Sequence, residues 1–241
     1  GYAIIFYDDG STWLEGAPDA RKDTRAAQRA FRQFAGPRQT IESFYSDNAP
    51  ELIKAADELE WVHPTSTPQH SKTNGRAERK IQHAKEGTRV ALERSGMLLG
   101  AWDFALPHFC MASNFAEVDG ESAWKKRHKK GSFKGIQRPF GSRVDFLPPK
   151  SLKQRLPVFS PSAVPGVFMG WHMHPGGHWS KDYLVSYLPD FEAVQSGKTR
   201  KIHVYRVRDI HVNEGPVEFP LKKAADELKG TVTKGRRGRE G

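Results

Sequence analysis

The chain has 241 residues, a net charge of +10, 37% hydrophobic residues and one cysteine, so it can fold around its own core but cannot hold an internal disulfide or a multi-cysteine zinc site. No stretch reaches the ~18 to 20 apolar residues that a membrane span requires. Residues 1–60 carry 7 Lys and Arg against 11 Asp and Glu, whereas residues 61–241 carry 31 against 17, so the displaced positive charge predicts a polyanionic partner, with a well-solvated basic surface as the alternative.

Eight elements are predicted in the first half of the chain, strands from alternating apolar residues and helices from apolar residues three or four apart. Turn and capping residues mark their ends, since Asp9 and Gly10 separate the first two strands and Asp23 or Thr24 caps the first helix. In chain order they are strands over 2–8 and 11–18, a helix over 23–36, a strand over 40–46, a helix over 49–60, a strand over 61–64, and helices over 74–96 and 101–118. This order predicts a mixed α/β domain over residues 1–118.

The composition changes after that domain. Residues 122–155 hold eleven Lys and Arg and one acid, which predicts a basic linker over 119–155 that acts as a hinge or contacts nucleic acid. Short β-like runs follow over 164–171, 181–188 and 199–212. They predict a small SH3-like β-barrel domain over 156–215, and a basic, partly disordered tail is expected over 216–241.

Two acids stand at predicted element ends. Asp47 follows the strand over 40–46, and Glu78 lies in the expected first turn of the helix over 74–96. Carboxylates converging from such positions can hold a divalent hard cation such as Mg²⁺, which serves phosphoryl chemistry by clamping the attacking and leaving oxygens. The alternatives are a plain N-cap for Asp47 and, for Glu78, an acid that stabilises the helix start.

The segments around these acids resemble a known family. YSDNAPEL and HPTSTPQHSKTNGRAER are similar to the integrase core of retroviruses and long-terminal-repeat retrotransposons, above all the copia-like group. Asp47 matches the second acid of that family's DDE triad and Glu78 the third. FYDDGSTWLEG upstream, and RPFGSRVDFLPP with VPGVFMGW downstream, extend the resemblance to about residue 213.

This resemblance implies an RNase H-like mixed sheet with flanking helices, and a DNA polynucleotidyl transferase and endonuclease that uses Mg²⁺ or Mn²⁺ at Asp47 and Glu78. The implied reaction is the processing of retroelement DNA ends and their transfer into target DNA. The implied partners are DNA, further copies of the chain and other segments of a Pol polyprotein, with no membrane. The implied places are the nucleus for action and a cytoplasmic particle during assembly.

Polar and basic residues around Glu78 are expected to position DNA without reading its sequence. Lys85 lies seven residues after Glu78, two helical turns along the same face, although an exposed helix face is the alternative interpretation. The expected DNA-binding set is Gln69, Lys72, Asn74, Arg76, Arg79 and Lys85.

The family's first acid is not matched. The chain starts without Met inside an apolar strand and is interpreted as a fragment that begins after the strand bearing that acid. Asp8 is either a substitute ligand or, with Asp9, a turn acid. With an incomplete triad, strand transfer by the fragment is expected to be absent or very low. The alternative functions are a degenerate retroelement remnant that only binds nucleic acid, and a different RNase H-like nuclease.

Overall fold

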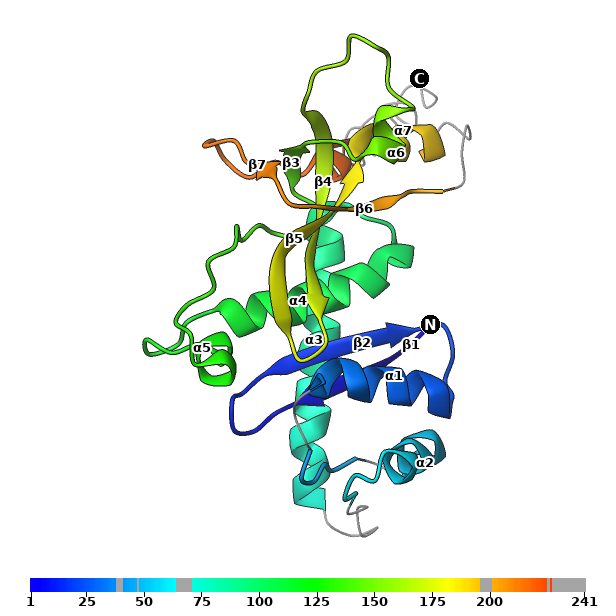
Figure 1. The fold of residues 1–241 in the computed structure, drawn as a ribbon, viewed down its shortest axis with the longest axis vertical. Helices are drawn as coiled ribbons and strands as arrows, with labels where there is room; N and C mark the ends of the chain where they lie inside the picture. The colour runs from blue at the N-terminus through cyan, green and yellow to red at the C-terminus, as the bar shows by residue number, and fades with distance from the viewer. Residues whose placement is uncertain (38–40, 47, 64–70, 196–200, 225, 227–241) are drawn as a thin grey trace, which may run out of the picture. The chain divides into compact units, whose positions relative to one another are not determined.

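The computed structural model describes residues 1–37, 41–46, 48–63, 71–195, 201–224 and 226, with the side chains of 71–74 and 195 left aside (Figure 1). The chain divides into two compact units, here called unit 1 (1–87, 106–135 and 173–180) and unit 2 (88–105, 136–172 and 181–241). Helices and strands are interspersed, so the chain is α/β as predicted. Among the described residues, no helix combines the length and apolar character needed to cross a bilayer. The boundaries predicted at 118, 155 and 215 stay predictions.

Unit 1 begins with an antiparallel hairpin. Strands β1 (Tyr2–Tyr7) and β2 (Leu14–Asp19) pair with Tyr7 opposite Leu14. The backbone N–H of Asp8 donates to the Trp13 carbonyl at 2.9 Å, which closes the intervening turn. The predicted hairpin is therefore confirmed, and its second strand starts three residues late because the turn takes up residues 8–13.

Helix α1 (Thr24–Ala35) packs on this hairpin (Figure 1). The Asp23 carboxylate accepts from the Ala26 N–H at 2.8 Å as its N-cap, and Gly36 ends it at a φ of 78°. Its buried face includes Ala27, Ala30 and Phe31, three or four residues apart as predicted. Helix α2 (Pro50–Glu58) then packs against α1.

The strands predicted over 40–46 and 61–64 are wrong for the described part of these segments. Residues 41–45 and 61–63 form no regular strand, and Ser46 makes only an isolated bridge. Between the two segments, the Phe44 N–H donates to the Val62 carbonyl at 3.2 Å. Aromatic packing is the reason, because the Phe44 and Trp61 rings lie 5.0 and 5.1 Å from the Phe31 ring. Phe44 therefore packs against the core, and Tyr45, which an alternating strand would bury, is exposed.

Two long helices follow, α3 (Ser71–Ser95) and α4 (Trp102–Phe115), separated by the short 3₁₀ helix η1 (Leu99–Ala101). Both long helices were predicted, and Gly96 ends α3 at a φ of 71° as expected. The start of α3 was predicted at Asn74, but the helix begins at Ser71. Nothing in the 71–74 sequence opposes helical backbone, and helix ends are the least determined part of such a pattern.

Helix α4 is attached to β2 by a side chain. The Asn114 amide donates to the Leu14 carbonyl at 2.7 Å, and its oxygen accepts from the Leu14 N–H at 2.8 Å. Both residues are buried. Asn114 therefore replaces a neighbouring strand for one residue of β2 and satisfies two backbone groups that water cannot reach.

The predicted basic linker contains ordered elements. Helix α5 (Ala123–His128) is capped by Ser122, whose hydroxyl accepts from the Lys125 N–H. The Arg127 guanidinium lies 4.9 Å from the Trp13 ring and 4.8 Å from the Phe34 ring, and it donates to the carbonyls of Phe34 and Gly176. These contacts fix α5 within unit 1.

Unit 2 contains a five-stranded sheet in the order β6-β5-β4-β3-β7. Its strands are β3 (Arg143–Phe146), β4 (Val164–His174), β5 (His178–Tyr187), β6 (Val204–Val207) and β7 (Ile210–His211), with helices α6 (Lys150–Lys153) and α7 (Leu188–Gln195) between them. The pairs β3–β4, β3–β7 and β5–β6 are all antiparallel. Its core includes Leu92, Met97, Phe140, Val167, Met169, Phe191 and Leu221.

The three β-like runs of the sequence are confirmed as strands, the last as the pair β6 and β7. Strand β3 and helices α5, α6 and α7 were missed. The helices have only six, four and eight residues, too short for a helical period to show.

Candidate nucleic-acid interface

One face of α3 is basic near its start. Arg76, Arg79, Lys80 and His83 are spaced three, four and seven residues from the first, so they stand on one side of the helix. Their side chains are exposed or half-buried. The helix backbone therefore aligns three permanent cations and one imidazole over two turns.

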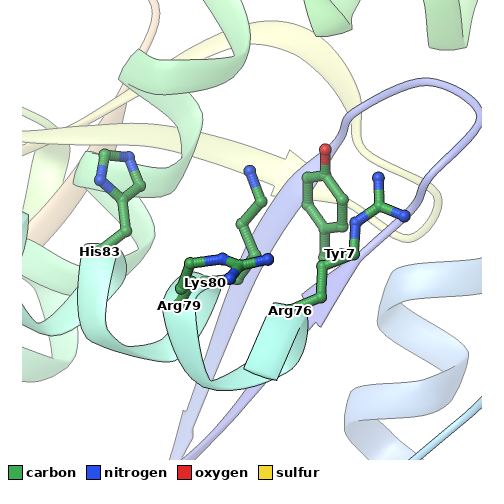
Figure 2. Close-up of a pocket in the computed structure, with 5 residues that line it drawn as sticks. All are labelled: Tyr7, Arg76, Arg79, Lys80 and His83. Carbon is green, nitrogen blue, oxygen red and sulfur yellow. The ribbon is translucent and has the colours of Figure 1, made fainter. Parts of the chain in front are cut away.

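Tyr7, at the end of β1, completes this face. Figure 2 shows its ring next to Arg76 and Lys80, with Arg79 and His83 on the other side of Lys80, and together the five residues line a pocket of about 360 Å³. The Lys80 ammonium lies 4.1 Å from the Tyr7 ring centroid and the Arg76 guanidinium 6.0 Å from it, both within cation–π range. We call Tyr7, Arg76, Arg79, Lys80 and His83 the basic pocket.

The hairpin turn supplies a carboxylate to the edge of this pocket. Arg76 donates to Asp9 through two nitrogens, at 3.1 and 3.2 Å. Both side chains are more than half exposed, at 58% and 62%, so this ion pair contributes little stability and Arg76 can exchange Asp9 for an anion from solution.

Asp8 has a different role. Its carboxylate accepts from the Gly10 N–H at 3.0 Å and from the Ser11 hydroxyl. The two contacts of Asp8 lie inside the turn and support its interpretation as a turn acid. Asp9 is paired with Arg76 instead.

Glu78 lies on another face of α3. It is the eighth residue of the helix, and no acid occupies the first turn. The sequence placed Glu78 in that first turn, so the interpretation of Glu78 as an acid that stabilises the helix start loses its basis, because the dipole effect falls off within one turn. At about 100° per residue, Glu78 points about 150° away from the centre of the basic pocket, and Lys85 points almost the same way as Glu78.

The predicted site residues are thus distributed over several places. Arg76 and Arg79 lie in the basic pocket, and Glu78 and Lys85 share a different, exposed face. Lys72 and Asn74 belong to α3 but their side chains lie outside the described residues, as do Asp47 and Gln69 altogether. Their roles in metal and DNA binding stay predictions.

Sequence reasoning missed Tyr7, Lys80 and His83. Helical spacing from Arg76 identifies Lys80 and His83, since positions four and seven residues on share its face. No pattern in the sequence indicates Tyr7, because only the fold brings the end of β1 beside α3.

Titratable groups of unit 1 outside the basic pocket have shifted pKa values, among them Cys110, His128 and Glu15. Burial raises the pKa of the Cys110 thiol to about 12, which makes it an inert core residue. Burial, together with the nearby His178 and Arg127, lowers the pKa of His128 to about 4. Burial also raises the pKa of Glu15, although hydrogen bonding to Trp13 and the charge of Arg127 oppose this.

No protein-family model and no curated protein matches the chain. Among solved structures, the chain is similar to one in the cryo-EM structure of the simian T-cell lymphotropic virus intasome in complex with PP2A regulatory subunit B56 gamma. The two share 14% sequence identity with a TM-score of 0.43, over 88% of this chain and 72% of that chain.

Proposed function

We propose that the chain is a DNA-binding part of a retroelement-type integrase and holds DNA phosphates in the basic pocket of unit 1. The observation that carries this proposal is the pocket itself, in which Arg76, Arg79 and Lys80 converge around one open volume. A phosphodiester fits this chemistry because guanidinium groups match its oxygens and ammonium groups neutralise its charge. The excess of Lys and Arg over residues 61–241 supports a polyanion as the partner.

The bound DNA would also be the substrate of a metal-dependent reaction. The resemblance of the two acid motifs supports an RNase H-like unit followed by a small SH3-like barrel, and DDE-class transfer of DNA ends. Glu78 presents an exposed carboxylate, the ligand type that Mg²⁺ and Mn²⁺ prefer, and Asp47 would be its partner by motif. When bound, the ion would polarise the scissile phosphate, while Lys85, on the same face of α3 as Glu78, would hold the adjoining strand.

Further copies of the chain and other Pol segments would assemble with it on DNA ends, in a cytoplasmic particle and then in the nucleus. The resemblance of the two acid motifs to integrases supports both the partners and the locations.

The test of phosphate binding is a salt titration. Arg79→Ala and Lys80→Ala should each reduce the salt dependence of duplex DNA binding by about one unit of log–log slope, equally for unrelated sequences, because each removes one phosphate contact. Arg76 is a poorer choice, since its removal exposes the charge of Asp9.

Lys54→Ala is the matched control. Lys54 is exposed on α2, where its nearest carboxylate is 4.0 Å away, and its loss changes net charge equally. If Lys54→Ala lowers the slope as much as Lys80→Ala, only net charge acts and the basic pocket is not the site.

The second candidate is a DNA-binding module without catalysis. It is favoured because both hairpin acids already have protein partners: Asp8 accepts bonds inside the turn, and Asp9 is paired with Arg76. Joining of a DNA end in Mn²⁺ by the purified chain, abolished by Glu78→Gln, would reject this candidate. DNA binding without joining would support it.

A further inference from the structure

The loop between α6 and β4 displays two apolar side chains in water. Phe159 is 98% and Val158 is 93% exposed, the highest values among the large apolar residues of the described chain. The Ser160 N–H donates to the Pro157 carbonyl at 3.0 Å, so Val158 and Phe159 are the two central residues of a tight turn. We call residues 157–160 the apolar turn (Figure 1, between α6 and β4).

The base of this loop is firmly held. Leu152 of α6 is fully buried, and the Arg155 guanidinium donates to Asp190 at 2.6 Å and to the Tyr205 hydroxyl at 3.0 Å. At the other end Val164 is buried at the start of β4. Anchors on both sides, with Pro157 and Pro161 restricting the backbone, reduce the entropy that the apolar turn would lose on binding.

The sequence around the apolar turn carries only positive charge. Residues 146–172 of unit 2 contain Lys150, Lys153 and Arg155 and no Asp or Glu. Because Arg155 is paired with Asp190, Lys150 and Lys153 are the exposed cations of this segment that a phosphate can meet. An exposed aromatic ring among cations is the arrangement by which proteins hold unpaired nucleic acid, because bases stack on the ring and phosphates meet the cations. Apolar side chains of this kind also enter between base steps of a duplex.

We infer that the apolar turn is a second nucleic-acid contact, in which Phe159 stacks on an unpaired or unstacked base while Lys150 and Lys153 hold the adjoining phosphates. Val158 covers the edge of the same base. This inference rests on the proposed DNA-binding function and adds to it a preference for distorted or single-stranded sites over uniform duplex.

The experiment uses the full chain and three fluorescent DNAs: a paired duplex, the same duplex with a two-nucleotide bulge, and a single strand, each with 2-aminopurine at the central position. Stacking lowers the fluorescence of this base. Wild type should bind the bulged and single-stranded probes more tightly than the duplex and quench their 2-aminopurine. Phe159→Ala should weaken binding to these two probes about 5- to 100-fold and abolish the quenching, with duplex binding within twofold.

Two variants make the result specific. Phe159→Trp keeps a stacking ring and should retain binding and quenching. Leu99→Ala removes another exposed apolar side chain of unit 2, 78% exposed, and should leave all three probes unaffected. Circular dichroism of Phe159→Ala should match wild type because the side chain has almost no contacts to lose.

The inference is overturned if Phe159→Ala binds and quenches all three probes like wild type. It is also overturned if Phe159→Ala alters only binding to phosphatidylserine vesicles, which would make the apolar turn a membrane contact. In either case, weak duplex binding by the Arg79→Ala and Lys80→Ala variants would leave the proposed function standing. Absence of DNA binding by wild type would remove both.

Discussion

Replacement of Asn114 by alanine should destabilise unit 1 severely. Asn114 gives Leu14 a donor and an acceptor at 2.7 and 2.8 Å, and Asn114 is only 1% exposed. The replacement leaves two buried backbone groups of Leu14 without a partner, and each costs about 1 to 3 kcal/mol. The free energy of unfolding should therefore fall by about 2 to 6 kcal/mol.

Urea unfolding followed by tryptophan fluorescence measures this loss. Trp13, next to Leu14 in the chain, is completely buried, and it is one of four tryptophans of unit 1 among the six whose summed emission follows unfolding. Ser113→Ala is the control, because the Ser113 hydroxyl donates only to the Phe109 carbonyl of its own helix, at 2.9 Å. Equal urea midpoints for Asn114→Ala and Ser113→Ala would refute the assignment of Asn114 as a substitute strand partner.

Three further changes test other parts of the fold. Gly87→Ala should cost about 1 to 3 kcal/mol in urea unfolding, because the new Cβ would meet the Phe109 ring at 2.0 Å, whereas Gly75→Ala, with nothing within 4 Å, should be neutral or stabilising. The pKa of His128 falls from 6.5 to about 4 on folding, so the unfolded chain binds the proton more readily and the free energy of unfolding decreases as pH falls from about 6.5 to about 4. Urea titrations of His128→Gln at pH 7.5 and 5.0 should show a smaller difference in stability than those of wild type. Arg155→Ala should lower the thermal midpoint more than Arg143→Ala, because it leaves the buried Asp190 carboxylate without its 2.6 Å partner, while Arg143 stands 4.0 Å from its nearest acid.

The sequence predicted those elements whose conformation is determined by residues close together in the chain. The apolar stripe of α1 and the Asp9-Gly10 turn are complete in a few residues, and both were found. The segments around Phe44 and Trp61 were assigned to strands because alternation cannot show that these rings pack on Phe31.

The same limit applies to the candidate site. Arg76 and Arg79 were proposed from a motif, and Lys80 and His83 follow from helical spacing, since one helix supplies all four. Tyr7 comes from a strand about seventy residues earlier, and the contact between them exists only after folding. The predicted acid pair has the same long-range character.

Arg127 has a consequence for mutational scanning. In a scan that replaces each lysine and arginine in search of DNA contacts, Arg127→Ala would register as a strong loss, because it removes two carbonyl partners and two ring contacts inside unit 1. A replacement that abolishes binding by collapsing the scaffold looks the same as one that removes a contact. The charge count of residues 122–155 therefore overstates the number of side chains that report on DNA, and Arg127 serves best as the reference for a folding defect.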